Sequence, residues 1–258
     1  MTNSAPNHIC DISHTSTHQA SASARGDTAG GAGGLVIAVD GPAGSGKSSA
    51  ARGVARALDL RYQDTGSMYR ALTWWLLDRQ VDTTDSLAVL ASFRRPVLEV
   101  GTDPAAPGIT MDGQDVAGPI RTREVSNAVS AVAALPEVRE YLIAQQRQII
   151  ADALAAGIGI VAEGRDIGSV VAPDAEVKVF LTASEAIRAR RRSADLVADP
   201  KATAELTQRE QARRDRRDAP QMARAADAVE IDTTALDLDQ VIAEIVGLAR
   251  SRRPVRRG

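Results

Sequence analysis

Residues 41–48 read Gly41-Pro42-Ala43-Gly44-Ser45-Gly46-Lys47-Ser48 and fit the phosphate-binding loop pattern G-x-x-x-x-G-K-[ST]. An apolar run, Leu35 to Val39, precedes them, and a segment with helical periodicity follows, which is the context the pattern requires. The glycines let backbone N–H groups converge on a polyphosphate at a helix N-terminus. Lys47 supplies a cation for the β- and γ-phosphate oxygens, and Ser48 supplies a hydroxyl ligand for Mg²⁺. The eight residues and Ser49 therefore predict a nucleoside triphosphate site.

The amino-acid composition indicates which binding partners and which cellular compartment to expect. The chain has 258 residues, 44% of them hydrophobic, which predicts one main domain with an inserted subdomain or two. Its 33 acidic and 31 basic residues nearly balance, so we expect neither a nucleic acid nor a membrane as partner. No stretch approaches the length of a transmembrane helix. We expect a soluble cytoplasmic protein, and a monomer.

The distribution of histidine and cysteine narrows the chemistry. The three histidines (His8, His14 and His18) and the single cysteine (Cys10) all lie in residues 1–34, a stretch predicted to be disordered. The folded body therefore offers no imidazole base, thiol nucleophile or Cys/His zinc site. Its chemistry must be carried by Lys, Arg, Asp, Glu and hydroxyl groups. Phosphoryl transfer suits that set, because it depends mainly on positioning and electrostatics.

The remaining pattern alternates short apolar runs with helical segments, as in a parallel α/β sheet. A second strand ends near Gln63, and later strands are predicted at Ile158–Ala162, Val177–Leu181 and Ala228–Ile231. Ligands of such sheets bind beyond the carboxyl ends of the strands. We therefore expect three segments to converge on one site: Asp40–Ser48, Asp64–Arg70 and Glu163–Asp166.

Two stretches do not fit that sheet. Pro96–Val100, Ile109–Met111 and Gln114–Val116 predict a small antiparallel meander, with Asp112-Gly113 as a two-residue hairpin turn. The other stretch is the arginine-rich segment 185–221, which Thr182-x-x-Glu185 is predicted to open as a capping box. Its arginines fit either exposed helices with i,i+4 charge pairs or a mobile lid over polyphosphate. We favour the lid.

A second motif separates a kinase from a switch protein. Asp64-Thr65-Gly66-Ser67-Met68-Tyr69-Arg70 begins at the end of the second strand and runs into a helix. Ras-type GTPases read guanine with N-K-x-D, but the only asparagine after the phosphate loop is Asn127, followed by Ala-Val-Ser. Guanine recognition of that kind is excluded.

These two motifs resemble those of bacterial cytidylate kinases, and the resemblance extends from Leu35 to Arg250. It rests also on four further stretches: Ile120-Arg121, Asn127-Ala128-Val129-Ser130, Val138-Arg139 and Glu163-Gly164-Arg165-Asp166. The resemblance implies a P-loop NTPase-type α/β fold with a parallel five-stranded sheet flanked by helices. It also implies a kinase domain over 35–250 with an inserted antiparallel-sheet acceptor subdomain at about 66–150 and a helical lid at about 185–221. Residues 251–258 are expected to be a basic, solvated tail.

The same resemblance assigns roles to individual residues. It implies that Thr65, Tyr69 and Arg70 adjoin the acceptor nucleotide, with Arg70 and Arg165 on its α-phosphate. Ser130, Arg139 and Asp166 would read the cytosine edge, where a carboxylate suits the amino group and hydroxyl or guanidinium donors suit N3 and O2. Arg214 would bind phosphates and Asp218 the ribose. The catalytic cations implied are Lys47, Arg165, Arg188, Arg192 and Arg214. Structural alternatives remain: Ser130 as an ordinary helix hydroxyl, Arg139 as a surface charge and Asp166 as a helix N-cap.

The implied activity is ATP- and Mg²⁺-dependent phosphorylation of CMP and dCMP. Two alternatives stay open: another small-molecule kinase on this fold, and a non-catalytic ATP-binding regulator with a degenerate lid. The lid departs from the family pattern, because Gln221 stands where an arginine is expected. Either Arg217 or Arg224 substitutes for it, or the lid closes with one cation fewer. Asp40 has two equal interpretations as well, orienting Mg²⁺-bound water or holding the strand end.

Overall fold

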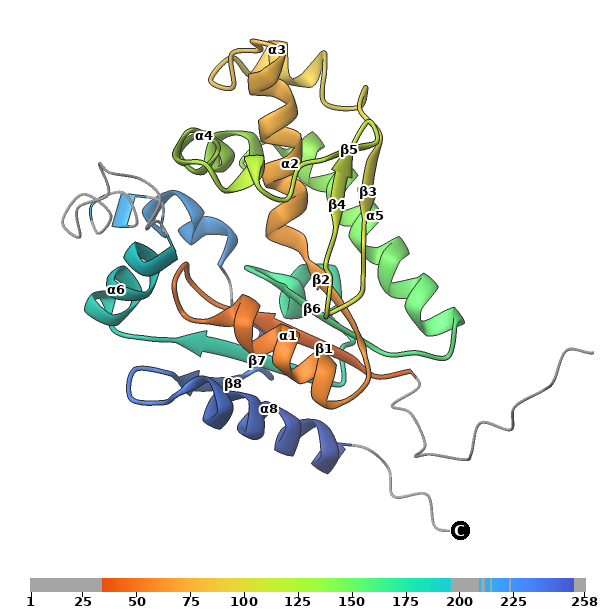
Figure 1. Ribbon diagram of the computed structural model, residues 1–258, viewed down its shortest axis with the longest axis vertical. Helices are drawn as coiled ribbons and strands as arrows, with labels where there is room; N and C mark the ends of the chain where they lie inside the picture. Colours follow the sequence, from red (N-terminus) through yellow and green to blue (C-terminus); the bar gives the residue numbers. More distant parts are fainter. Residues whose placement is uncertain (1–33, 196–208, 210–211, 214, 223, 253–258) are drawn as a thin grey trace, which may run out of the picture. The chain divides into compact units, whose positions relative to one another are not determined.

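A parallel five-stranded sheet forms the centre of the protein (Figure 1). The computed structural model describes residues 34–195, 209, 212–213, 215–222 and 224–252. The strands are β1 (Val36–Asp40), β2 (Arg61–Asp64), β6 (Ile160–Gly164), β7 (Val177–Thr182) and β8 (Val229–Asp232). They lie in the order β2-β6-β1-β7-β8, and every neighbouring pair is parallel. The predicted fold class is confirmed.

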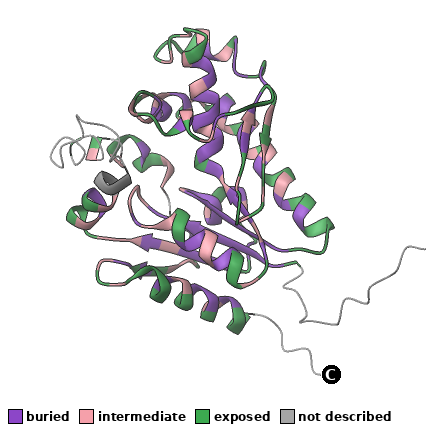
Figure 2. Cartoon of the chain, in the orientation of Figure 1, coloured by how far each residue is buried: buried purple, intermediate pink, exposed green. Residues whose placement is uncertain are grey.

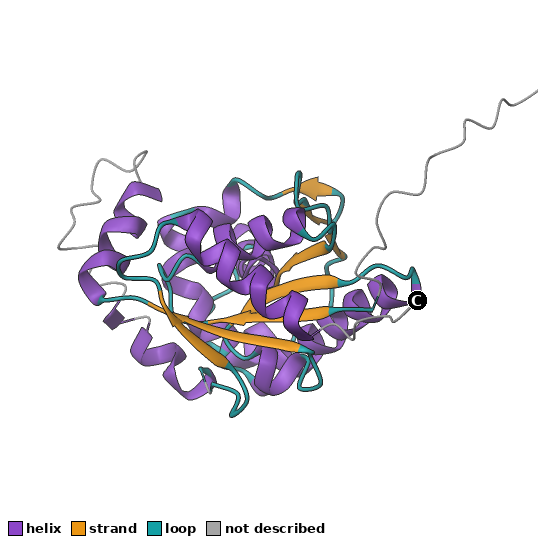
Figure 3. Cartoon of the chain, turned by 90° about the horizontal axis from the view of Figure 1, so that it is seen from below, coloured by secondary structure: helices purple, strands orange, loops and turns teal. Residues whose placement is uncertain are grey.

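Helices cover both faces of this sheet (Figure 3). They are α1 (Lys47–Ala57) and α8 (Leu238–Arg252) on one face, with α5 (Pro136–Ala155) and the single turn η2 (Ile167–Val171) on the other. Side chains of β1 alternate between the two layers: Ile37 and Val39 pack with α1 and α8, and Val36 and Ala38 pack with α5 and η2. All of β1 is therefore buried, which explains its unbroken apolar run.

Strand register brings the predicted site segments to one edge of the sheet. Asp40 of β1 lies opposite Gly164 of β6, and Asp64 of β2 lies opposite Glu163. The loops that leave these three strands therefore begin at the same level. The expectation that they converge follows directly from this register.

Strand β6 begins two residues later than predicted, and the end of α5 explains the shift. Gly157 has a φ of +71°. Its N–H donates to the carbonyl of Leu154, and that of Ile158 donates to the carbonyl of Ala153. These two bonds form the helix-ending motif in which a left-handed residue closes the last turn. Ile158 therefore belongs to the helix termination, and the strand begins at Ile160.

The segment predicted to be an inserted acceptor subdomain runs from α2 to α5. Its elements before α5 are α2 (Thr65–Asp78), α3 (Ser86–Leu90), β3 (Leu98–Val100), β4 (Ile109–Met111), β5 (Gln114–Asp115), η1 (Pro119–Arg121) and α4 (Arg123–Ala133). Helix α2 carries an extensive buried face (Figure 2). A separate apolar cluster packs against it and includes Leu72, Leu76, Met111 and Leu142. The subdomain thus has a core of its own.

The predicted meander is confirmed, including its turn. Strands β3, β4 and β5 form an antiparallel sheet in that order. Asp112 and Gly113 both have positive φ, +50° and +78°, as a type I′ hairpin turn requires. The Asp112 carboxylate accepts from Val97 N at 2.8 Å and from Trp75 Nε1 at 2.7 Å. This aspartate ties the turn to α2.

The loop between β3 and β4 connects the subdomain to the core. The N–H of Tyr62 in β2 donates to the carbonyl of Thr102 at 2.9 Å. Arg52 and Arg56 of α1 both donate to the carbonyl of Pro104. The acceptor sheet is therefore held to the helix that follows the phosphate loop.

The segment predicted to be the lid begins with α6 (Glu185–Asp195) and ends with η3 (Ala219–Gln221). The predicted capping box at Thr182 is wrong, because Thr182 is the last residue of β7, paired with Asp232. Ser184 takes that place, and its hydroxyl accepts from the N–H of Ile187. Most of the predicted lid between 196 and 214, with Arg214 itself, lies outside the described residues.

The predicted N-terminal tail, 1–34, lies outside the described residues except for Gly34. The predicted C-terminal tail, 251–258, does so except for Ser251 and Arg252, which belong to α8. Within the described ranges, no helix has the length and hydropathy needed to cross a membrane.

Candidate active site

The phosphate loop lies between β1 and α1, where the motif predicted it. Gly41, Gly44 and Gly46 all have positive φ, at +145°, +77° and +91°. A Cβ on Gly41 would lie 2.1 Å from the carbonyl oxygen of Leu181 in β7. Only glycine fits there, because the loop passes directly against the backbone of the neighbouring strand.

Three of the predicted catalytic cations contact carbonyl oxygens of this loop. Lys47 Nζ donates to Pro42 O at 2.9 Å. Arg165 Nη1 donates to Gly41 O at 2.8 Å, and Arg188 Nη1 donates to Ala43 O at 3.2 Å. These side chains come from α1, from the turn after β6 and from α6. The fold thus gathers positive charge from distant segments around the loop, as a polyphosphate site requires.

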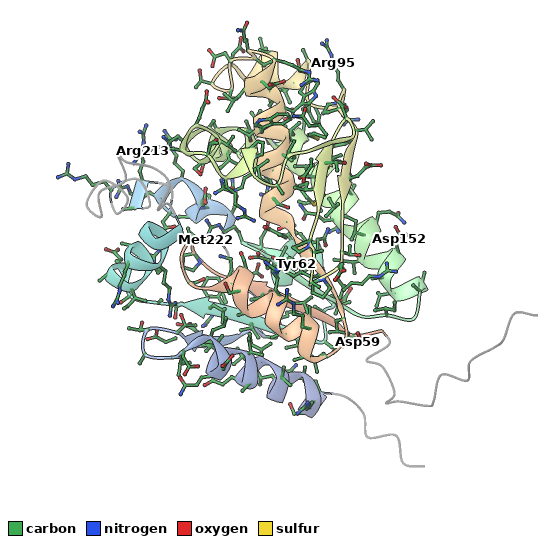
Figure 4. The ribbon with its side chains drawn as sticks, viewed as in Figure 1. Asp59, Tyr62, Arg95, Asp152, Arg213 and Met222 are labelled. Atoms are coloured by element: carbon green, nitrogen blue, oxygen red, sulfur yellow. The ribbon has the colours of Figure 1, made fainter. Side chains whose placement is uncertain are left out.

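A buried carboxyl group stands beside Lys47 and Ser48. Tyr62 donates its phenolic hydrogen to Glu163 Oε1 at 2.9 Å, and the Ser48 side chain is also hydrogen-bonded to Glu163. Burial raises the pKa of Glu163 to about 7, the charge of Asp64 adds to this, and Lys47 opposes it. Burial also raises the pKa of Tyr62, whose place in the structure is labelled in Figure 4. Sequence reasoning gave Glu163 no role of its own, although a carboxylate ending the strand next to the phosphate-loop strand was a usable signal.

The start of α2 is held at the same edge. Asp64 caps the helix by accepting from Ser67 N at 2.9 Å. Thr65 Oγ1 donates to Glu163 O at 2.7 Å. Arg70, one turn further on, donates to Ile120 O and to Ser126 Oγ. The predicted acceptor residues Thr65 and Arg70 are therefore both fixed, one against β6 and the other against α4.

Two of the three residues predicted to read the base, Arg139 and Asp166, meet in the structure. Arg139 of α5 forms an ion pair with Asp166, which follows β6. Burial raises the pKa of the Tyr69 phenol in α2, the charge of Arg139 lowers it and the charge of Asp166 raises it. Arg139 is therefore no free surface charge. Asp166 occupies the N-cap position of η2, but its side chain makes no capping bond there and pairs with Arg139 instead.

Ser130, the third predicted base contact, is joined to the lid. Its hydroxyl donates to Asp218 Oδ1 at 2.9 Å. The other oxygen of Asp218 lies 3.0 Å from Arg165 Nη2. Met222, labelled in Figure 4, adds a contact of 3.8 Å between its sulfur and Arg165 Nη1. One lid acid thus bridges the acceptor subdomain and the core.

The other predicted lid cations are outside the described residues, exposed, or directed to other partners. Arg214 and the side chain of Arg192 lie outside the described part of the chain. Arg217 is exposed, and Arg224 pairs with Glu230 of β8. Gln221 is the last residue of η3.

Asp40 has a structural partner. Its carboxylate oxygens accept from the backbone N–H groups of Ile167 and Gly168, both at 2.8 Å. These bonds favour the interpretation that Asp40 holds the segment after β6 against the end of β1. Burial raises the pKa of Asp40 to about 6, and the two backbone hydrogen bonds oppose this rise.

Comparison with known proteins decides the family. A family model described as cytidylate kinase matches residues 37–251. The chain belongs to the cytidylate kinase family. A cytidylate kinase of Streptomyces griseus is 51% identical over 221 residues, covering 85% of this chain and 94% of its own. Those of Streptomyces coelicolor and Nocardia farcinica are 53% and 45% identical, covering 85% and 82% of this chain and 94% and 91% of their own.

These matches confirm the resemblance to cytidylate kinases that the motifs indicated. The family match begins in β1 and ends within α8, so it includes the phosphate loop and the segments predicted to be the acceptor subdomain and the lid.

Proposed function

We propose that the protein transfers the γ-phosphoryl group of ATP to the α-phosphate of CMP or dCMP, giving ADP with CDP or dCDP. Membership of the cytidylate kinase family supports this. The observation that carries it is the convergence of the phosphate loop, Arg165 and the Arg139–Asp166 pair at one edge of the sheet. One side of that arrangement suits a triphosphate, and the other suits an aminopyrimidine edge.

Base recognition follows from hydrogen-bonding types. Cytosine presents an amino donor beside the N3 and O2 acceptors. Asp166 supplies an acceptor for the amino group, while Arg139 and Ser130 supply donors for the other two atoms. Uracil presents a carbonyl oxygen in place of the amino group, so a carboxylate disfavours it.

The reaction needs no general base. The acceptor phosphate has its second pKa near 6, so at neutral pH it is already an anion. The protein has to hold two mutually repelling anions in line and to neutralise the charge that spreads over the transferring group. Lys47, Arg165 and Arg188 lie at the phosphate loop, and Arg70 is one turn inside α2. Arg192 and Arg214 are proposed to add to this set when the lid closes.

The donor set beside the loop suits Mg²⁺. Ser48 supplies a hydroxyl, and Asp64 and Glu163 supply carboxylate oxygens, the hard ligands that Mg²⁺ prefers. We propose that Ser48 holds the ion directly and that the two carboxylates act around it. Bound there, Mg²⁺ neutralises oxygens of the β- and γ-phosphates.

Aspartates of the protein pair with arginines that the substrates are proposed to contact, so a bound substrate has to displace these aspartates. Arg188 pairs with Asp215, Arg139 with Asp166, and Arg165 with Asp218. These pairs hold the guanidinium groups in place and spare each arginine from being desolvated alone. We propose that the acceptor phosphate takes the place of Asp218 on Arg165, which frees Asp218 for the ribose.

The test is an ADP-coupled assay of the full chain with ATP, Mg²⁺ and a panel of acceptors: CMP, dCMP, UMP, AMP, GMP and shikimate. We expect ADP release that depends on CMP and dCMP, with UMP well below both. Turnover with another acceptor and not with CMP would support a different small-molecule kinase. ATP binding without acceptor-dependent ADP release would support a non-catalytic regulator, and either result overturns the proposal.

A further inference from the structure

Arg191 of α6 makes contacts that the proposed reaction does not use. Its Nη1 and Nη2 atoms each lie 2.9 Å from an oxygen of Thr233, the hydroxyl and the carbonyl respectively. Nη1 also donates to the carbonyl of Ser45 in the phosphate loop, at 3.4 Å. One guanidinium group therefore joins the base of the lid, the segment after β8 and the loop that receives phosphate.

Thr233 reinforces the same contact from beneath. It is 1% exposed and follows directly after β8. Its hydroxyl lies 3.1 Å from Ser45 O and 3.0 Å from Thr182 O, and its N–H donates to Thr182 O. The carbonyl of Ser45 thus accepts from Arg191 and lies within hydrogen-bonding distance of Thr233, whose single hydroxyl hydrogen is shared between Ser45 O and Thr182 O.

Fixing that carbonyl fixes the next N–H. In a trans peptide unit the carbonyl and the following N–H point in opposite directions. Holding Ser45 O toward Arg191 and Thr233 therefore turns the N–H of Gly46 to the opposite side of the loop. Gly46 is the N-cap of α1, with a φ of +91°, and helix N-termini present their N–H groups to anions. The geometry of one carbonyl sets the direction of a donor at the phosphate site.

We infer that Arg191, with Thr233, is a positioning residue that orients the phosphate loop for the polyphosphate of the donor nucleotide. Arg191 bonds here to neutral carbonyl and hydroxyl oxygens, whereas Arg188 and Arg165 pair with carboxylates that substrates can replace. This inference rests on the proposed function only in taking ATP as the ligand of the loop.

The experiment measures donor and acceptor binding separately. ATP is titrated into the full-length protein by calorimetry without acceptor, and KM for ATP and for CMP are determined in the coupled assay. The variants are R191A, R191K, T233V and T233S. Arg190, exposed on the same helix, provides the matched control R190A.

We expect R191A and T233V to raise Kd and KM for ATP about tenfold, as expected for one or two lost hydrogen bonds near the loop. KM for CMP should stay within about twofold. T233S keeps the hydroxyl and should bind ATP like the wild type, and R191K keeps the charge without the two-pronged geometry and should lie between. The double variant R191A/T233V should lose less ATP-binding free energy than the two single variants lose together, because both side chains act on one carbonyl.

ATP affinities of R191A and T233V equal to that of R190A would overturn the inference. An equal loss of CMP affinity would overturn it too, since that indicates general damage to the fold. If R191A does not fold, R191K and T233V decide the question. Failure of the proposed function is distinguishable, because a protein that does not phosphorylate CMP still gives an ATP titration.

Discussion

Arg165 Nη2 lies 3.0 Å from Asp218 Oδ2, so a cation at the end of β6 is neutralised by an acid of the lid region. The same carboxylate accepts a hydrogen bond from Ser130 in α4. Three parts of the protein thus meet at one side chain. The proposed contact of Asp218 with ribose requires this arrangement to rearrange.

Asp218→Ala should therefore weaken acceptor binding. We expect KM for CMP to rise about tenfold or more, because the ribose loses its acceptor and this loss outweighs the removal of a carboxylate that competes with the acceptor phosphate for Arg165. KM for ATP should change little. Steady-state kinetics with each substrate varied in turn checks this, and an unchanged KM for CMP would remove Asp218 from the ribose site.

Lys47→Ala should act on catalysis. The Lys47 ammonium lies against the carbonyl of Pro42 in the phosphate loop, and its charge matters most while the γ-phosphoryl group is in flight. We expect kcat to fall by at least about a hundredfold, with the thermal midpoint and CMP affinity preserved. Near-normal turnover would mean that the loop is not catalytic.

Asp166→Ala should relax the choice of base. Removing the carboxylate leaves no acceptor for the cytosine amino group and removes its repulsion of uracil O4. We expect the ratio of kcat/KM for CMP over UMP to fall. Arg139→Ala serves as a comparison, since it breaks the same ion pair but leaves the carboxylate. If the ratio is the same as in the wild type, Asp166 does not read the base.

The missing lid arginine can be located by three variants. Arg224 is occupied with Glu230 on β8, which leaves Arg217 as the candidate that can turn toward the phosphates when the lid closes. We expect Arg217→Ala to lower kcat about tenfold or more and Arg224→Ala to leave it within about twofold. Gln221→Arg should then add little. A large gain from Gln221→Arg with two silent alanine variants would show instead that the lid is one cation short.

The pH dependence of stability should carry a contribution from Asp40. Its pKa is raised from 3.8 to about 6 in the folded protein, so the folded state binds its proton more tightly than the unfolded state does. Stability from this group is fully present below pH 4 and is lost as the pH rises through about 6. A rise of that size corresponds to about 3 kcal/mol at most.

Urea denaturation of the wild type and of Asp40→Asn between pH 4 and pH 7 measures this contribution. The variant cannot ionise there, so the difference in unfolding free energy, wild type minus variant, should fall as pH rises. Asparagine also places an NH₂ group against one of the two backbone N–H donors, so the variant should be less stable at every pH. If the unfolding free energies of the wild type and the variant change with pH in the same way, the Asp40 carboxyl does not titrate in this range.

The fold followed closely from the sequence because its signals are local. The phosphate loop, the alternation of strands and helices, and the Asp112-Gly113 turn each depend on neighbouring residues, and all are present in the structure. Thr182 shows the limit of such signals. Its pattern matched a capping box, but pairing with Asp232 in β8 extended the strand through it.

The site followed only in part, because several of its contacts join residues far apart in the chain. Arg191 and Ser45 are 146 positions apart, and nothing in the run Arg190-Arg191-Arg192 singles out the middle residue. The periodicity of α6 decides which of the three arginines faces the phosphate loop. The position of β8 decides that Thr233, which follows it, contacts Arg191. The resemblance to a family indicated Arg139 and Asp166 as base-reading residues, and the structure shows that they pair with each other.

Trp74 and Trp75 are the protein's two tryptophans, and both lie in α2 of the acceptor subdomain. Trp75 is bonded to the carboxylate of Asp112, and the Arg79 guanidinium lies 4.2 Å from its ring centroid. Intrinsic emission excited at the long-wavelength edge therefore comes from this subdomain and not from the sheet or the lid. The protein carries a built-in optical reporter, so stopped-flow mixing with CMP can time the movement of one subdomain without any attached dye.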